Sequence, residues 1–316
     1  MNPKRILIFN HRHIGDVLMT TPAMWAIREQ FPNAWIDCVT NMKGKFVLRQ
    51  QLLVDRLFDE KEIDTIPGKG WYDIAVLFKA TFRNARCAKK LKIKKRVGKR
   101  MEGNQLFLTD SVKTENPHWI HQNNEILFPL GISKVSDQMK YLIPPQLVTP
   151  EIPKPYIVLN PGASTPTNRW PAPNFARLAN YIMERFPHHV VITGAREDSR
   201  NAEEIKKRVI HRKRIHNLAG KTRIEELAST LKDASAVVTG DTGPMHLAIA
   251  VNQRNVLALF GPANEALTGP LSKYGTVLAK DLNGAWRKSN PKFEQVPVSL
   301  ITPEEVCEHL GKRLTR

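Results

Sequence analysis

Short apolar runs alternate with stretches of helical periodicity along most of the chain, and this alternation constrains the fold more than any other feature. Residues 5–10 (RILIFN) are typical of a strand buried on both faces, and residues 16–30 then carry apolar side chains mainly at helical spacing. Further strands are predicted at residues 34–40, 54–58 and 73–78. Such alternation predicts a parallel sheet covered by helices on both faces.

The alternation is clearer after residue 155. Strands are expected at residues 156–160, 190–193, 215–218, 236–239 and 255–260, and helices at 174–186, 203–209, 222–231, 244–251 and 303–310. Thr222 and Glu225 have the spacing of a capping box, which opens the third of these helices. Because strands and helices alternate in both halves, both are predicted to be doubly wound α/β domains.

A proline-rich segment separates the two halves. Five prolines stand between positions 144 and 155, and proline fits neither a helix interior nor a central strand. This composition is typical of a linker between domains. We therefore expect an N-terminal domain at residues 1–150 and a C-terminal domain at residues 151–316.

Composition limits the class of protein. No run approaches the roughly 20 apolar residues of a membrane-spanning helix, and three separated cysteines in 316 residues indicate neither a disulfide framework nor a zinc site. We expect a cytoplasmic protein without a secretion signal or an anchor. The formal net charge of +18 predicts an anionic partner and leaves nucleic acid, a phosphorylated sugar and an acidic membrane surface open.

Loops that directly follow strands are the candidate sites, because open parallel sheets bind ligands at the carboxyl ends of their strands. In residues 11–16 (HRHIGD), Asp16 stands in the first turn of a helix, where a carboxylate is either a cap or a general base. Arg12 and the two neighbouring histidines are either surface residues or ligands.

Two later loops have the composition of anion sites. Residues 235–246 lead a buried strand into a glycine and a helix start, whose free N–H groups bind phosphate or are simply well capped. Residues 160–171 combine small residues, hydroxyl groups and Arg169, as in a phosphate-binding loop or a plain loop. The signatures of P-loop NTPases, GxGxxG dehydrogenases, zincins and α/β-hydrolases are missing, and no D-x-D pair follows a strand.

Taken together, these loops resemble those of a known family. Residues 6–23, 160–171, 241–246 and 260–270 are similar, in this order, to the motifs of glycosyltransferase family 9, the lipopolysaccharide heptosyltransferases. The resemblance implies a GT-B fold, in which two Rossmann-like domains face each other across a cleft. Residues 1–150 would bind the acceptor and residues 151–316 the nucleotide sugar, and the last helix, near 303–310, would pack back on the N-terminal domain.

The same resemblance implies the reaction and its residues. The enzyme would transfer a heptose from ADP-heptose to a hydroxyl of the lipopolysaccharide inner core, with inversion and without a metal or cofactor. Asp16 matches the family's general base. Residues that match its donor contacts are Ser164, Thr165, Arg169, Asp198 (ribose), Thr222 (adenine), Asp241, Thr242, Gly243 and His246.

Two departures from the family pattern concern charge. Many members carry lysine where this chain has Asn168, so either Arg169 supplies the missing charge or the donor differs from ADP-heptose. The residues His11, Arg12 and His13 stand where members more often have an arginine followed by small hydroxyl residues, which indicates an atypical acceptor. Arg12 and His13 are predicted to bind it.

A basic segment supplies much of the net charge. Residues 89–100 hold eight cations in twelve positions, which indicates either a solvated surface or a docking site for acidic sugars or anionic lipid. Without interleaved aromatic residues it does not favour nucleic acid. We expect peripheral contact with the cytoplasmic face of the inner membrane, and the remaining alternatives are a basic binding protein without catalysis and an idle family member. The predicted contact residues are Lys94, Lys95, Arg96 and Arg100.

Overall fold

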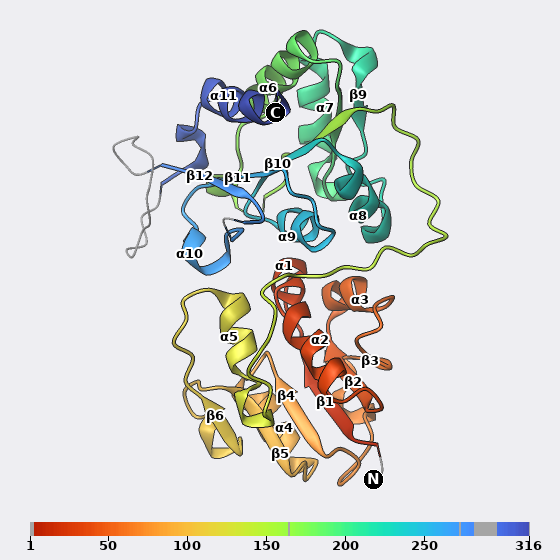
Figure 1. Cartoon of the computed structure of the whole chain (residues 1–316), viewed down its shortest axis with the longest axis vertical. Coiled ribbons are helices and arrows are strands. Elements are labelled where there is room, and N and C mark those ends of the chain that lie inside the picture. Colours follow the sequence, from red (N-terminus) through yellow and green to blue (C-terminus); the bar gives the residue numbers. More distant parts are fainter. Residues whose placement is uncertain (1–2, 164, 272, 281–295, 316) are drawn as a thin grey trace. The chain divides into compact units, whose positions relative to one another are not determined.

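The computed structural model describes residues 3–163, 165–271, 273–280 and 296–315, and the chain forms two compact units, Met1–Leu142 and Ile143–Arg316. Ser164, a predicted donor contact, lies outside the described residues. Each unit is built on a six-stranded parallel sheet with helices, as Figure 1 shows. The predicted pair of doubly wound, Rossmann-like domains is confirmed.

In the N-terminal unit the strand order is β3-β2-β1-β4-β5-β6, so the chain reverses its direction of winding between β1 and β4. Ligands of open sheets bind at such a switch point. The elements are β1 (Arg5–Phe9), α1 (Ile14–Leu18), α2 (Thr21–Gln30), β2 (Trp35–Thr40), α3 (Met42–Leu48), β3 (Arg56–Asp59), η1 (Glu60–Thr65), β4 (Ile74–Leu77), α4 (Phe82–Lys90), β5 (Lys95–Lys99), η2 (Asn104–Leu106), β6 (Asp110–Val112), α5 (Trp119–Glu125) and η3 (Phe128–Leu130).

The C-terminal sheet has the equivalent order β12-β11-β10-β7-β8-β9, with its switch point between β7 and β10. Its elements are β7 (Tyr156–Asn160), η4 (Pro166–Asn168), α6 (Ala172–Arg185), β8 (His189–Ile192), η5 (Arg196–Asp198), α7 (Ser199–Lys207), η6 (Arg212–Arg214), β9 (Ile215–Asn217), α8 (Ile224–Asp233), β10 (Ala236–Gly240), α9 (Gly243–Ala250), β11 (Val256–Phe260), α10 (Glu265–Thr268), β12 (Thr276–Ala279), η7 (Val298–Leu300) and α11 (Pro303–Leu314).

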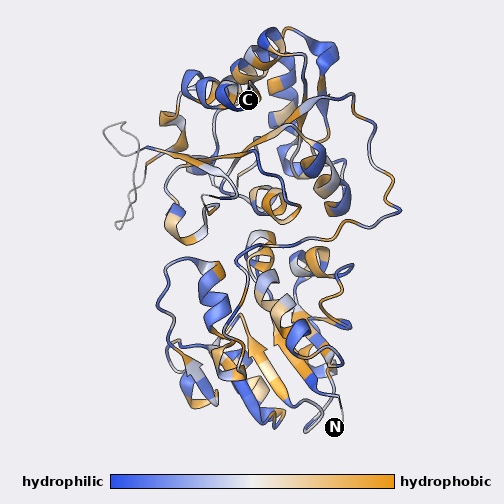
Figure 2. Cartoon of the chain, viewed as in Figure 1, coloured by the Kyte–Doolittle hydropathy of each residue, from blue (hydrophilic) through white to orange (hydrophobic). Residues whose placement is uncertain are grey.

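The central strands are apolar on both faces, as their sequences predict. β1 pairs in parallel with β2 and β4, and β7 pairs with β8 and β10. Every residue of β7 is buried, as is β1 after its first residue. Figure 2 shows β1 and β4 in the colour of hydrophobic residues. Because helices cover both faces of β1 and β7, the polar groups next to these two strands gather at the strand ends.

Two predicted helix boundaries are wrong. The helix expected at residues 16–30 is two helices, since α1 ends at Leu18 and α2 begins at Thr21. Pro22, in the first turn of α2, has no N–H to continue the hydrogen bonds of α1. The predicted capping box is displaced by one residue, because Arg223 is the N-cap and its N–H donates to Glu226 Oε2 at 2.7 Å.

The last helix is longer than predicted and contributes to the core of its own unit. α11 lies against α6 of its own unit, and its buried Val306 and Leu310 belong to the C-terminal core with Ile182. Trp170 Nε1 donates to Ile301 O at 2.7 Å and anchors the segment that leads into α11. The expectation that this helix also packs back on the N-terminal domain stays a prediction.

A buried carboxylate joins the outer strands of the N-terminal sheet. Asp37, in the middle of β2, is fully buried and accepts hydrogen bonds from Tyr72 Oη (2.5 Å), Trp35 Nε1 (2.8 Å) and Arg56 Nη2 (2.8 Å). Burial, followed by the bond to Asp37, raises the pKa of Tyr72. Asp37 therefore connects β2 with β3 and with the segment before β4.

We expect Asp37→Ala to lower the free energy of unfolding by about 2–4 kcal/mol, because it leaves a buried hydroxyl and an arginine without their acceptor. Urea denaturation followed by circular dichroism measures the loss. Asp64→Ala removes an exposed carboxylate from η1 and is the control. Equal stability of the two variants would contradict the role of Asp37.

Candidate functional site

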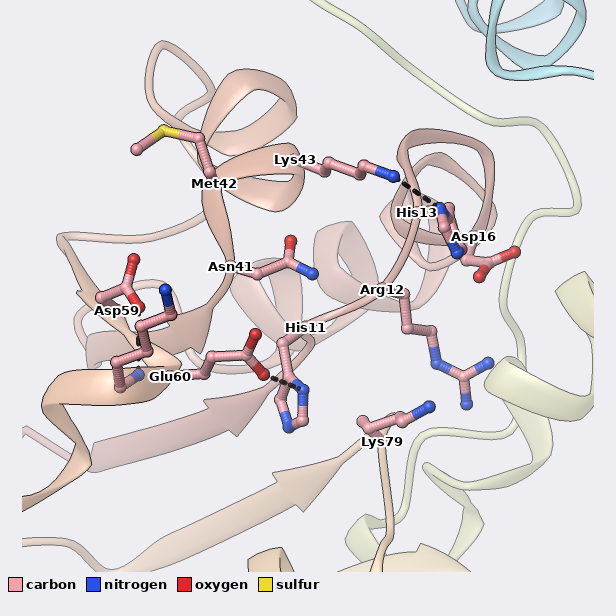
Figure 3. Close-up of a pocket in the computed structure, with 11 residues that line it drawn as sticks. His11, Arg12, His13, Asp16, Asn41, Met42, Lys43, Asp59, Glu60 and Lys79 are labelled. Carbon is pink, nitrogen blue, oxygen red and sulfur yellow. Dashed lines mark hydrogen bonds and ion pairs between the residues drawn. The ribbon is translucent and has the colours of Figure 1, made fainter. Parts of the chain in front are cut away.

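A pocket of about 460 Å³ lies at the carboxyl ends of the strands around the N-terminal switch point. Figure 3 shows that charged side chains of both signs line it. They come from the loops after β1, β2, β3 and β4, so residues far apart in sequence meet at one sheet edge. The lining residues are His11, Arg12, His13, Asp16, Asn41, Met42, Lys43, Asp59, Glu60, Lys61 and Lys79.

His11 joins three of these loops. Its Nδ1 lies 2.6 Å from Glu60 Oε2, and its Nε2 lies 2.7 Å from Asn84 Nδ2. Asn84 Nδ2 also donates to Lys79 O at 2.7 Å, so it is a donor and His11 Nε2 accepts. The proton of the neutral ring is therefore on Nδ1 and is donated to Glu60. Burial lowers the pKa of His11, against the attraction of Glu60.

Arg12 and Lys79 lie near this histidine, and Lys99 lies near Arg12. The Arg12 guanidinium donates to Phe78 O at 2.6 Å, and its Nε is buried without a partner among the described residues. Burial lowers the pKa of Arg12, and burial with the charge of Arg12 lowers that of Lys99. Lys79 lines the same pocket. Cations held this close to one another favour an anionic ligand.

Asp16 stands in the first turn of α1, and its side chain lines the pocket (Figure 3). The N-cap of α1 is His13, and no side chain caps this helix start. Within the described part of the chain, the Asp16 carboxylate accepts no hydrogen bond. The interpretation as a cap therefore lacks the bond that it requires, whereas a general base needs a carboxylate that is open to its substrate. His13 is exposed, and its Nδ1 lies 3.0 Å from Lys43 Nζ.

In the C-terminal unit, the loop after β7 lies on the ends of neighbouring strands. A Cβ at Gly240 would stand 3.4 Å from Asn168 O, and one at Gly261 would stand 3.0 Å from Thr167 O. Glycine at the ends of β10 and β11 thus leaves room for η4. Thr165, Thr167 and Arg169 of this loop are exposed.

The helix that follows β10 begins without a side-chain cap. Thr242, the N-cap of α9, places its hydroxyl 3.2 Å from Thr239 Oγ1. Gly243 opens the helix, and Pro244 lacks an N–H. The positive end of α9 and the Gly243 N–H are therefore directed at the carboxyl edge of the sheet, where an anion is favoured.

Arg169 and Asn168 differ in their surroundings. Arg169 Nη2 donates to Ala163 O at 3.0 Å, and the side chain stays exposed. Asn168 Oδ1 is buried without a partner in the described residues. A cation thus stands in the loop, one residue after the position where lysine was expected.

The other predicted donor contacts have mixed surroundings. Asp198 is 8% exposed, and its Oδ2 accepts from Ala195 N–H at 2.9 Å, which closes the turn before α7. Asp198 also fills the space beside Gly162 and Gly194. His246 is buried in α9, whereas Thr222 and Asp241 are partly exposed. For Asp198 the structure gives a structural role, and its role as a ribose ligand stays a prediction.

The basic segment is divided by its contacts. Lys95 Nζ pairs with Asp110 at 2.9 Å, and Arg96 donates to Phe107 O at 2.6 Å and to Ile93 O. These two side chains form bonds within the unit, and their contact with a surface stays a prediction. Lys94 and Arg100 are exposed and make no side-chain bond to the described residues.

Two Rossmann-like units, each with polar loops at its switch point, define a GT-B glycosyltransferase fold. The sequence matches the profile of "Glycosyltransferase family 9 (heptosyltransferase)" over residues 68–296. The chain belongs to this family and is a glycosyltransferase.

Relatives resemble the chain over its length. Lipooligosaccharide heptosyltransferase 2 of Haemophilus influenzae is 28% identical, over 98% of this chain and 99% of its own. Lipopolysaccharide heptosyltransferase 2 of Escherichia coli is 25% identical, over 98% of each. Among solved structures, a family 9 glycosyltransferase of Veillonella parvula has a TM-score of 0.81 at 23% identity, covering 99% of this chain and 97% of its own. The E. coli ADP-heptose LPS heptosyltransferase II has a TM-score of 0.74 at 22% identity, covering 98% of each.

Sequence reasoning missed several residues of the N-terminal pocket. Glu60, Lys43 and Lys79 line it, and Lys99 stands near Arg12. Lys79 had a usable signal, since it closely follows the predicted strand at residues 73–78. Glu60 also closely follows a predicted strand, at residues 54–58, but its contact with His11 depends on the pairing of β2 with β3.

We expect acid to destabilise the chain through His11. Its pKa is lowered by folding, so the unfolded chain binds more protons as the pH falls through the unfolded value of about 6.5, and stability falls with it. Urea denaturation at pH 7.5 and 5.5 should show a larger loss for the wild type than for His11→Gln. Because His188 and His216 titrate in both proteins, they cancel; equal losses would contradict this reading.

Proposed function

We propose that the chain transfers a heptose from ADP-heptose to a hydroxyl of the lipopolysaccharide inner core, with inversion and without a metal. Membership of family 9 and the similarity to heptosyltransferases 2 support the sugar and the acceptor class. The observation that carries the mechanism is the Asp16 carboxylate, which lines the N-terminal pocket and accepts no hydrogen bond from the described residues.

Asp16 would act as the general base. It takes the proton of the acceptor hydroxyl while that oxygen bonds to the anomeric carbon, and the bond from this carbon to the diphosphate breaks on the opposite face. The products are the glycoside and ADP, and the carboxyl then releases its proton to water. A well-placed base contributes about 10²–10⁴-fold in rate.

The C-terminal unit would bind the donor at the switch point between β7 and β10. The start of α9, with Thr242 and Gly243, would bind the diphosphate, and Arg169 would offset the charge that develops on the leaving group. Thr165 offers a further hydroxyl contact. Asp198, Thr222, Asp241 and His246 remain predicted contacts of the nucleoside and diphosphate.

The acceptor would lie in the N-terminal pocket. The carboxylates and phosphates of an inner core would pair with the cations Arg12, Lys79 and Lys99. Arg12 Nε is a buried donor without an acceptor among the described residues, and the ligand would supply one. His13 and Lys43 extend the polar lining toward solvent. We place the enzyme at the cytoplasmic face of the inner membrane, since such an acceptor is anchored in lipid.

We expect Asp16→Asn to lower kcat by about 10²–10⁴-fold and to leave the affinity for ADP unchanged, because only the proton acceptor is removed. Transfer assays and calorimetry measure the two effects. Asp64→Asn is the control, since it removes a carboxylate from the exposed side of η1. Normal turnover of Asp16→Asn would refute the role of Asp16.

The donor site is tested by titration with ADP, UDP, GDP and ADP-heptose in the absence of divalent metal. We expect selective binding of ADP and ADP-heptose, weakened about 10-fold or more by Arg169→Ala, because a charge-assisted bond to phosphate is lost. Thr242→Val should weaken it as well. Arg254→Ala, an exposed arginine after α9, is the control. A preference for UDP or GDP would indicate a nucleotide sugar other than ADP-heptose as the donor. If none of the four ligands bound, the proposed donor site would be refuted.

A further inference from the structure

Exposed apolar side chains accompany the basic segment at one corner of the N-terminal unit. Phe82 is 52% exposed at the start of α4, Met101 is 48% exposed after β5, and Leu106 is 71% exposed at the end of η2. Large apolar side chains that stand together in water indicate an interaction surface. These three residues follow or cover the carboxyl ends of β4 and β5.

The contacts between α4 and η2 hold this corner together. The Phe82 ring lies edge-on to Phe107 with centroids 4.9 Å apart, and Lys89 Nζ donates to Leu106 O at 3.3 Å. Buried Asn104 donates to Ala80 O at 2.6 Å, which joins η2 to the loop before α4. The apolar side chains are therefore presented on a fixed base.

Positive charge surrounds these side chains. Residues 79–106 contain eleven lysines and arginines and a single carboxylate, Glu102. Along α4, Arg83, Arg86 and Lys90 recur at helical spacing on the exposed face, which is also the face of Phe82. None of these three cations forms a side-chain hydrogen bond or ion pair with the part of the chain that the structure describes. Their charge is thus available to an external partner.

We propose that this face, formed by Phe82, Arg83, Arg86, Lys90, Met101 and Leu106, docks the enzyme on an anionic lipid bilayer. Its cations meet lipid phosphates, and its apolar side chains enter the interface between headgroups and acyl chains. A bilayer complements both features, whereas a nucleic acid complements the charge and could stack a base only on Phe82, leaving Met101 and Leu106 without a partner. Among the described residues no helix could cross a membrane, so such contact is peripheral.

The proposal deepens the proposed function, since it places the enzyme beside a lipid-anchored acceptor, but its test requires neither donor nor acceptor. The full-length protein is sedimented with phosphatidylcholine vesicles that contain either no phosphatidylglycerol or 30 mol% of it. We expect binding to the anionic vesicles only. Each neutralised cation should weaken binding about fivefold, so Arg83→Gln/Arg86→Gln/Lys90→Gln should abolish detectable binding.

A second variant, Met101→Ser/Leu106→Ser, tests the apolar contribution and should weaken binding at least 10-fold. The matched controls lie in the C-terminal unit. Lys207→Gln/Lys213→Gln/Arg254→Gln removes three exposed cations, and Ile210→Ser removes an exposed apolar side chain. Both controls should bind as the wild type does, and circular dichroism checks that every variant is folded.

Several outcomes would overturn the proposal. One is failure of the wild type to bind the anionic vesicles, and another is an equal loss of vesicle binding in the control variants. A third is unchanged binding of Met101→Ser/Leu106→Ser, which would show that the face binds anions without inserting apolar side chains into the bilayer. Binding of a single-stranded oligonucleotide through the same cations, without vesicle binding, would indicate nucleic acid instead. Failure of the proposed transfer reaction would leave these vesicle results unchanged, so the two proposals can fail separately.

Discussion

Burial of β1 and β7 on both faces determines where polar groups can stand in each unit. Their backbone groups bond to a strand on either side, and their side chains pack under helices. Polar residues begin at the end of each strand. Buried Asn10, directly after β1, donates to Thr20 Oγ1 at 2.8 Å, and buried Asn160, the last residue of β7, donates to Thr193 Oγ1 at 3.2 Å. The loops that carry the candidate chemistry begin immediately after these two asparagines.

Much of the fold follows from local sequence because a strand buried on both faces has an unbroken apolar run. β1, β2, β4 and the five strands from β7 to β11 were predicted in this way, within a residue or two. β5 was not, because Lys95, Arg96 and Lys99 alternate with small and apolar residues and read as solvated charge. Their long side chains reach Asp110, backbone carbonyls and Gln122, and these contacts are formed only by distant parts of the chain.

Some residues of the candidate site could be identified from local sequence, whereas others are brought to it only by the folded sheet. Asp16, Thr242 and Gly243 follow predicted strands closely, and their loops could be identified by the motifs alone. The partners of His11 could not, since Glu60 and Asn84 meet it only after β3 and β4 take their places in the sheet. Asp198 combines both kinds of information, because its bond to Ala195 N–H spans three residues whereas its approach to Gly162 forms only in the folded unit.

The loop after β7 has two properties that can change independently, the position of its backbone above the sheet and the charge of its side chains. A Cβ at Gly261 would stand only 3.0 Å from Thr167 O, so this glycine lets the backbone of the loop lie close to the end of β11, whereas a Cβ at Gly240 would make an ordinary contact with Asn168 O at 3.4 Å. The outward side chains of the loop carry no such restriction. Asn168 is followed by the exposed Arg169, so substitutions of side chains can change the charge of this loop while its backbone keeps its place above the sheet.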